Sequence, residues 1–159
     1  MKILVVSDTH RKDGMFQEAV LKEAPIDLVI HCGDIEGSEE IIQQIAGCPV
    51  EMVAGNNDFF SYLPKEKEFS LGKHKIWITH GHHYNVSLGR ERLKEEAKFR
   101  GVDIVIYGHT HKPIIEQDGD LLILNPGSLG YPRQEGRKPS YLVMEIDEKE
   151  ALNCSLHYL

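Results

Sequence analysis

Asp103-Ile104-Val105-Ile106-Tyr107-Gly108-His109-Thr110-His111 is an apolar run that stops at a glycine and continues into two histidines one residue apart. The apolar part is typical of a short buried strand, and the glycine marks its end. In an extended chain, residues two positions apart point to the same side. His109 and His111 are therefore predicted to direct two imidazoles at one point just past the strand.

Four other strand-like runs end in the same way, with carboxylate, amide or imidazole groups directly after the apolar residues. Their endings are Ser7-Asp8-Thr9-His10, His31-Cys32-Gly33-Asp34, Gly55-Asn56-Asn57-Asp58 and His80-Gly81-His82-His83. Of the nine histidines in the chain, seven lie in these five endings. Such oxygen and imidazole ligands suit Mn²⁺, Fe, Zn²⁺ or Ni²⁺ better than Ca²⁺ or Cu(I). We therefore expect the strand ends to converge on a metal centre.

The composition limits the architecture and the classes of partner. A chain of 159 residues suits one domain, which we place at residues 1–159. The net charge of −7 argues against extended nucleic acid or an acidic membrane as a partner, because phosphate backbones require a basic face. A small phosphorylated substrate is compatible with this charge, since a metal site supplies positive charge locally.

The cysteines and the apolar runs indicate in which cellular compartment the protein is expected. Cys32, Cys48 and Cys154 are scattered and form no CxxC pair, which argues against a disulfide framework or a thiolate zinc site. The sequence shows no signal peptide, and no apolar run approaches the ~18 residues of a membrane span. A cytoplasmic location without membrane association is the expectation.

The first half of the chain alternates strand and helix patterns. Strands are predicted at 2–7, 27–32 and 49–54. Helices are predicted at 14–23, capped by Asp13, and after the cap Ser38, with apolar faces made of Phe16, Val20 and Leu21 and of Ile41, Ile42 and Ile45. This βαβαβ order predicts a parallel sheet with right-handed crossovers.

The second half has a different pattern. A hairpin is predicted at 66–71 and 73–79, a helix at 87–100, and further strands at 103–107, 113–118, 120–124, 141–146 and 151–157. The apolar face of the helix is assigned to Leu88, Leu93, Ala97 and Phe99. The loop 125–139 is rich in Gly, Pro and Arg, and a loop of this length in a compact domain is more often functional than idle.

The polar endings, taken in order, resemble the motifs of the calcineurin-like metallophosphoesterases. The matching blocks are Asp8-Thr9-His10, Gly33-Asp34, Gly55-Asn56-Asn57-Asp58, His80-Gly81-His82 and Gly108-His109-Thr110-His111. Asn125-Pro126-Gly127-Ser128 with Pro132-Arg133 is similar to the small single-domain branch of bacterial and archaeal phosphodiesterases. The resemblance implies an α/β fold with two packed mixed β-sheets flanked by helices.

The resemblance also implies a ligand set for two divalent metal ions. One ion would be held by Asp8, His10, Asp34 and His111, and the other by Asp34, Asn56, His80 and His109, so that Asp34 bridges. Mn²⁺ is the expected metal, with Ni²⁺, Fe or Zn²⁺ as alternatives that the same ligands accept. The implied activity is hydrolysis of small phosphodiesters by in-line attack of a metal-bridging hydroxide.

One position departs from the pattern of many metallophosphoesterases, which carry a histidine directly after the ligand asparagine as proton donor to the leaving group. Here that position is Asn57, which cannot act as a general acid. The small branch commonly lacks this histidine. Either His82 donates the proton, or the substrates have leaving groups that need none. The candidate catalytic residues are Asp34, Asn57 and His82.

Several residues keep alternative interpretations. His82 and Arg133 are candidate substrate contacts, Asp58 is expected to fix its loop through backbone N–H groups, and His31 is expected to be a core histidine. Phe59, Phe60 and Tyr62 fit a dimer face, a substrate wall or the core, and a homo-oligomer is left open.

The alternatives to a phosphodiesterase are a phosphomonoesterase with the same site and a non-catalytic scaffold, of which the retromer complex subunit with this fold is a precedent. The complete ligand set favours catalysis.

Overall fold

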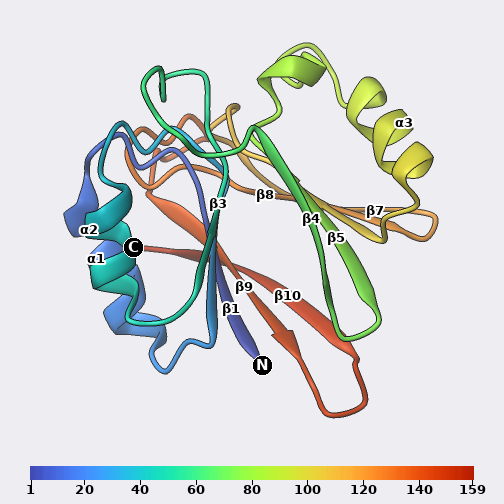
Figure 1. Ribbon diagram of the computed structural model, residues 1–159, viewed down its shortest axis with the longest axis horizontal. Helices are drawn as coiled ribbons and strands as arrows, with labels where there is room; N and C mark the ends of the chain where they lie inside the picture. Colours follow the sequence, from blue (N-terminus) through green and yellow to red (C-terminus); the bar gives the residue numbers. More distant parts are fainter.

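The computed structural model describes residues 1–159 and contains two five-stranded sheets (Figure 1). The first sheet has the order β10 (Leu152–Tyr158), β9 (Ser140–Ile146), β1 (Lys2–Val6), β2 (Leu28–His31) and β3 (Val50–Met52). Strands β1, β2 and β3 run parallel and are connected by helices α1 (Asp13–Glu23) and α2 (Glu39–Ala46). The predicted βαβαβ unit is thus confirmed, and β9 and β10 extend it antiparallel.

The second sheet has the order β4 (Glu66–Leu71), β5 (His74–Thr79), β6 (Ile104–Ile106), β8 (Leu121–Pro126) and β7 (Pro113–Asp118). Strands β5, β6 and β8 are parallel, whereas β4 and β7 pair antiparallel at the two edges. A short 3₁₀ turn at His82–Tyr84 and helix α3 (Glu91–Arg100) connect β5 to β6. Both sheets are therefore mixed, as the resemblance implied.

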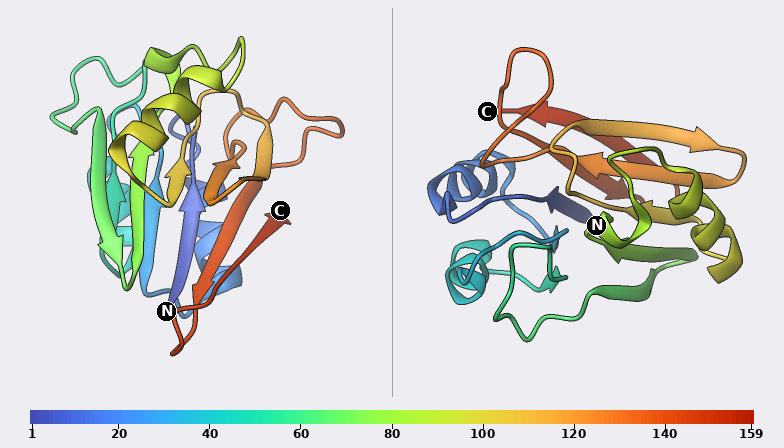
Figure 2. Two further views of the ribbon diagram at one scale, coloured as in Figure 1. Left: turned by 90° about the vertical axis from the view of Figure 1, so that its right-hand side faces the viewer. Right: turned by 90° about the horizontal axis from the view of Figure 1, so that it is seen from above.

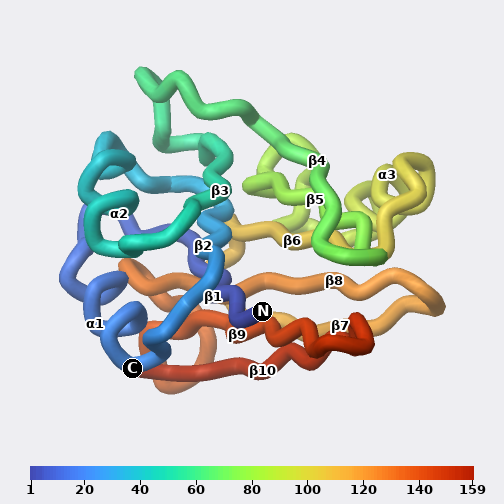
Figure 3. Tube along the Cα trace, turned by 60° about the horizontal axis from the view of Figure 1, so that its bottom comes forward, coloured from blue at the N-terminus to red at the C-terminus, as the bar shows by residue number.

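The molecule has four layers, with α1 and α2 outside the first sheet and α3 outside the second (Figure 2). The largest apolar cluster lies between the sheets and includes Ile3, Ile30, Ile78 and Ile106. Figure 3 shows the same layers, with α1 and α2 on one side of the strands and α3 on the other. No helix has the length and apolar character needed to cross a bilayer.

Helix α3 differs from its prediction. It begins at Glu91 rather than 87, and the side chains of Leu88 and Phe99 are 91% and 87% exposed. Leu93 and Ala97 are buried against the sheet, as predicted. Phe99 lies six positions after Leu93, which at about 3.6 residues per turn places it about 120° around the helix and outside the buried stripe.

The predicted cap position is confirmed for Ser38, which directly precedes α2, whereas the cap of α1 is Lys12 and not Asp13. Neither α1 nor α2 has a side-chain hydrogen bond at its cap, and Asp13 is the first helical residue of α1. Instead, the Ser38 hydroxyl donates a hydrogen bond of 3.0 Å to Asp13 Oδ2. The two residues therefore join the starts of the two helices.

Two other segments lie differently from what the sequence suggested. Strand β8 continues to Pro126, so Asn125 belongs to a buried strand end rather than to the following loop. Phe59, Phe60 and Tyr62 are 80%, 96% and 104% exposed, which excludes the core interpretation for them.

Candidate metal centre

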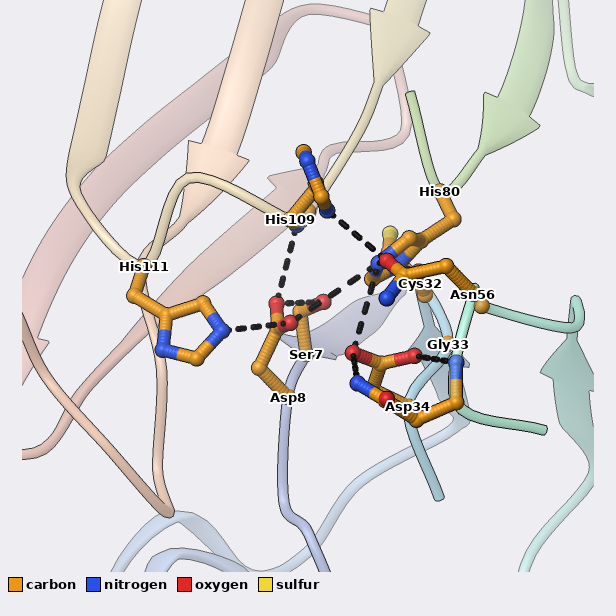
Figure 4. Close-up of polar contacts among 12 residues, drawn as sticks. Ser7, Asp8, Cys32, Gly33, Asp34, Asn56, His80, His109 and His111 are labelled. Atoms are coloured by element: carbon orange, nitrogen blue, oxygen red, sulfur yellow. Dashed lines mark hydrogen bonds and ion pairs between the residues drawn. The ribbon is translucent and has the colours of Figure 1, made fainter. Parts of the chain in front are cut away.

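The candidate ligands lie in the loops that follow five parallel strands. Asp8 and His10 follow β1, Asp34 follows β2, Asn56 follows β3, His80 follows β5, and His109 and His111 follow β6. The carboxyl ends of parallel strands share one edge of a sheet. Because the two sheets pack face to face, these two edges bring their loops together, and residues from both sheets meet (Figure 4).

Asp8, His10, Asp34 and His111 form a first cluster, in which one ligand atom from each residue lies within 4.8 Å of all the others. Asp8 Oδ1 is fully buried and accepts no hydrogen bond. It lies 3.0 Å from His111 Nε2 and 3.9 Å from His10 Nε2, and these two nitrogens are 3.4 Å apart. A buried carboxylate oxygen without a donor, facing imidazole nitrogens, fits a divalent metal ion.

Asn56, His80 and His109 form a second cluster. The side-chain oxygen of Asn56 lies 3.0 Å from His80 Nε2 and 2.9 Å from His109 Nδ1 (Figure 4). An amide oxygen and two imidazoles are again ligands that first-row divalent metals accept.

Asp34 lies between the two clusters. Its Oδ2 atom is 3.7 Å from His10 Nε2 and 3.5 Å from His80 Nε2. The carboxylate is fixed by Asn57, whose backbone N–H donates to Oδ1 at 2.9 Å and whose side-chain amide donates to Oδ2 at 2.7 Å. This placement suits one carboxylate shared by two ions.

The second ring nitrogen of three of these histidines also has a partner. His80 Nδ1 lies 2.7 Å from the Cys32 carbonyl oxygen, and His111 Nδ1 lies 2.6 Å from the Tyr131 carbonyl oxygen. His10 Nδ1 lies 2.6 Å from Glu36 Oε1. Such contacts fix the tautomer and the orientation of a ligand imidazole, leaving Nε2 free to face the site.

The backbone around the candidate ligands is not extended. Asp8, His10, Asp34, His109 and His111 all have left-handed φ values between 45° and 67°. The extended-chain prediction for the histidine pair is therefore wrong: His111 joins the first cluster and His109 the second. Backbone conformations that cost energy concentrate at functional sites, where the surrounding structure holds them in place.

Close packing around the loops requires glycine at two positions. A Cβ atom on Gly55 would lie 2.1 Å from Asp34 Oδ1, and one on Gly108 would lie 2.0 Å from Ser7 Oγ. Either contact is too short for a side chain. These glycines let two loop backbones approach the carboxylates.

Asp58 has the structural role that the sequence suggested. Its two oxygens accept hydrogen bonds of 2.6 to 2.9 Å from the backbone N–H groups of Asp34, Ile35, Glu36 and Gly55. The side chain thus ties the loop after β3 to the loop after β2. It positions Asp34 without facing the clusters itself.

Burial and neighbouring charges shift several pKa values at the site. Burial raises the pKa of Asp8, but the imidazoles of His111 and His80 and the Ser7 hydroxyl outweigh it and lower the pKa to about 2. Burial lowers the pKa of His31 to about 4. His31 is a core histidine, as predicted, with Nε2 3.1 Å from the Thr9 hydroxyl and Nδ1 accepting a bond from the backbone of Gly33.

His82 and Arg133, the candidate substrate contacts, lie at the margins of the site. The His82 ring centroid is 5.3 Å from that of His80 and 6.1 Å from that of His109, and its Nδ1 is buried without a partner. Burial and the neighbouring histidines lower the pKa of His82 to about 4. Arg133 is exposed and lines a cavity of about 720 Å³ that His10 and His111 also line.

Other residues at the site were not singled out by sequence reasoning. Glu36 contacts His10, but no sequence motif around Glu36 indicates this contact. Asn125 belongs to the Asn125–Ser128 motif, but the sequence does not indicate the role of its side chain. Its amide donates to the Gly108 carbonyl at 2.9 Å and to the Thr110 hydroxyl at 3.1 Å. The Ser128 hydroxyl donates to the Asp8 carbonyl at 2.8 Å. The end of β8 therefore supports the loops after β6 and β1.

Proteins with similar sequences are named as phosphoesterases. The chain is 36% identical over 159 residues to a protein of Methanocaldococcus jannaschii named as a probable metallophosphoesterase, a match that covers 98% of this chain and 80% of that protein. It is 32% identical over 145 residues to another protein of that organism, named as a phosphodiesterase, with 80% of this chain and 83% of the relative covered.

Solved structures agree with the fold. A Streptococcus pneumoniae protein described as a predicted phosphoesterase superposes with a TM-score of 0.81 at 28% identity, over 99% of this chain and 97% of that chain. Vps29 of Entamoeba histolytica, solved with Zn²⁺, has a TM-score of 0.78 at 24% identity over 99% of both chains and shares the fold. A family model described as the calcineurin-like phosphoesterase superfamily domain matches residues 1–149, and the chain belongs to this superfamily.

Proposed function

We propose that this protein is a phosphodiesterase that hydrolyses small phosphodiesters with two divalent metal ions. The observation that carries the proposal is the position of Asp34 Oδ2 between the imidazoles of His10 and His80, where one carboxylate serves both ligand clusters. Family membership supports a metal-dependent phosphoesterase. The step from phosphoesterase to phosphodiesterase is supported by a relative at 32% identity that is named as one.

The proposed ligand roles follow the two clusters. Asp8, His10, Asp34 and His111 would hold one ion, and Asp34, Asn56, His80 and His109 the other. When bound, such a pair lowers the pKa of a water molecule and stabilises the charge that develops at phosphorus. The mixed oxygen and nitrogen ligands fit Mn²⁺, and they accept Ni²⁺, Fe or Zn²⁺ as well.

Asn57 and His82 have proposed roles that need no proton transfer. Asn57 holds both oxygens of Asp34 and so fixes the carboxylate that faces both clusters. A histidine with a pKa of about 4 is neutral at neutral pH, and nearby cations would lower this pKa further. His82 is therefore better suited to hydrogen-bond a substrate oxygen than to protonate a leaving group. The preferred substrates would have leaving groups that need little protonation.

The test compares hydrolysis of bis(p-nitrophenyl) phosphate with that of p-nitrophenyl phosphate. The protein is stripped of metal and refilled with Mn²⁺, and Asp34→Asn is compared with Asp120→Asn, a change at an exposed turn. We expect metal-dependent cleavage of the diester, lost in Asp34→Asn and retained in Asp120→Asn.

The other outcomes separate the alternatives. A preference for the monoester would keep the metal centre and make the protein a phosphomonoesterase. Absence of turnover with Mn²⁺, Ni²⁺ and Zn²⁺ despite two bound ions would reject the enzyme and favour a scaffold role.

A further inference from the structure

We propose that the basic cavity beside His10 and His111 binds a second phosphate group of the substrate, one that is not cleaved. This inference rests on the proposed function, because it extends the substrate from a simple diester to one with a further anionic group on one arm.

The cavity has a volume of about 720 Å³ and a strongly one-sided charge. Three cationic side chains line it, namely Lys12, Arg133 and Arg137, and none of its lining residues is a carboxylate. This concentration occurs in a chain with a net charge of −7 and 25 acidic residues. The positive charge of this wall is therefore a local feature, because the chain as a whole is acidic.

The wall is connected to the metal centre by specific contacts. Lys12 Nζ donates a hydrogen bond of 2.7 Å to the Gly130 carbonyl and lies 3.8 Å from the centre of the Tyr131 ring. Tyr131 in turn packs edge-on against His10, at 5.1 Å between ring centroids, and its carbonyl faces His111 Nδ1. Lys12 thus orders the loop that carries the two arginines.

Arg133 is anchored next to the same ligand. Its backbone N–H donates to the His111 carbonyl at 3.0 Å, while its side chain is exposed along the cavity. A guanidinium offers several N–H donors in a planar arrangement that matches a phosphate. Arg137 lies four positions further along the loop and also lines the cavity.

The charge expected at the metal centre favours a second anion on the substrate. A phosphodiester carries a single negative charge at the cleaved group, and two divalent ions held by the carboxylates of Asp8 and Asp34 would still leave a net positive charge that offsets it. The three cations of the cavity have no role in neutralising that group. A second phosphate, with up to two further charges near neutral pH, would match them.

A second cavity, of about 700 Å³, opens on the side of Asn57 and has the opposite character. Its wall includes the carboxylates Glu36, Glu39 and Glu40 and the exposed aromatic rings of Phe59, Phe60 and Tyr62, with Arg11 as its one cation. This wall would repel a phosphate and accept an uncharged ring. The two cavities therefore orient an asymmetric diester, with its phosphorylated arm on the side of His10 and His111.

The experiment compares two dinucleotides that differ by one group: adenylyl-(3′→5′)-adenosine with and without a 5′-terminal phosphate. We expect the Mn²⁺-loaded protein to prefer the phosphorylated dinucleotide by about tenfold in kcat/KM, as one charge-assisted contact to phosphate would give. Arg137→Ala should remove most of this preference, and Arg137→Glu should reverse it. Lys138→Ala removes the neighbouring charge, which does not line the cavity, and should keep the preference.

An equal kcat/KM for the two dinucleotides, or a preference that survives Arg137→Glu, would overturn the inference. Hydrolysis of bis(p-nitrophenyl) phosphate is measured in parallel. If the wild type does not cleave this simple diester, the proposed function fails, and the dinucleotide comparison does not decide the inference. In that case, calorimetric titration of the metal-free protein with inorganic pyrophosphate decides. Salt-sensitive binding that Arg137→Glu abolishes supports the basic site, and equal binding by both proteins rejects it.

Discussion

Asp58 shows how a carboxylate outside the metal clusters shapes the site. Four backbone N–H groups from two loops donate to its two oxygens, and its side chain lies beside Asp34. A buried carboxylate with this many donors organises the loops around itself. Its removal would leave buried N–H groups without partners, which costs free energy for each group that water cannot reach.

We predict that Asp58→Ala lowers the free energy of unfolding by about 3 kcal/mol, because several charge-assisted hydrogen bonds are lost together. Urea denaturation of the metal-free protein measures this change. Asp120→Ala, at an exposed turn, is the control and should change stability by less than about 0.5 kcal/mol. A similar, small effect of both substitutions would mean that Asp58 does not hold the two loops together.

For single residues, the sequence indicated the residue types at the site but not their geometry. Apolar runs that end in Asp, Asn or His are visible in the chain, and this signal identified the candidate ligands. The left-handed backbone of Asp8 and His10 was not predictable. It depends on long-range bonds, such as those from their N–H groups to the carbonyls of Gly33 and Asp34. Glu36 was missed for the same reason, because its partner His10 is distant in sequence.

Among the elements, α1 is fixed to the first sheet by a polar contact at its end. Glu23 accepts a hydrogen bond of 2.8 Å from the Tyr141 hydroxyl and pairs with Lys2 Nζ at 2.9 Å. Burial raises the pKa of Glu23, but the bonds from Lys2 and Tyr141 outweigh burial and lower it below 4.5. This stabilisation is fully present above the ordinary pKa of a glutamate and is lost as the pH falls through the lowered value.

Replacing Glu23 by glutamine should therefore lower the Tm at pH 7 and have a progressively smaller effect as the pH falls below 4.5. The reason is that protonated glutamate resembles glutamine. Thermal unfolding of both proteins between neutral and acidic pH measures the difference. A Tm gap that stays constant or widens in acid would contradict this assignment.

Helix α3 provides a matched pair of substitutions. Leu93 is fully buried against the second sheet, whereas Phe99 on the same helix is 87% exposed. We expect Leu93→Ala to cost roughly 2–5 kcal/mol in the free energy of unfolding, through lost burial and a cavity, and Phe99→Ala to cost under about 0.5 kcal/mol. Denaturant unfolding measures both. A large cost for Phe99→Ala would mean that this face is covered.

At the element scale, strand runs were predictable because their apolar residues are consecutive. The extent and the buried face of α3 were not, because Leu88, Leu93, Ala97 and Phe99 do not fall on one stripe of a helix. The starts of α1 and α2 were predictable to within one residue, but the hydrogen bonds of the two polar residues there were not. Asp13 and Ser38 have suitable side chains for capping, but they bond to each other instead.

For the whole molecule, the packing of two sheets explains the site. Loops from β1, β2 and β3 bring Asp8, Asp34 and Asn56, and loops from β5 and β6 bring His80 and the later histidines, so neither sheet has a complete ligand set alone. The order of the motifs in the sequence was enough to identify the family and hence the two-sheet fold. The two cavities of opposite character were not predictable, because their walls combine segments distant in sequence, such as Lys12 and Arg137.

The number of ions bound per chain tests the shared role of Asp34 most directly. Metal-free protein would be dialysed against Mn²⁺, and the bound metal measured by elemental analysis for the wild type, for Asp34→Asn and for the control Asp120→Asn. Two ions per chain in the wild type and the control, with fewer in Asp34→Asn, is the predicted result. One ion or none in the wild type, or two ions retained in Asp34→Asn, would contradict a pair of metal sites joined by Asp34.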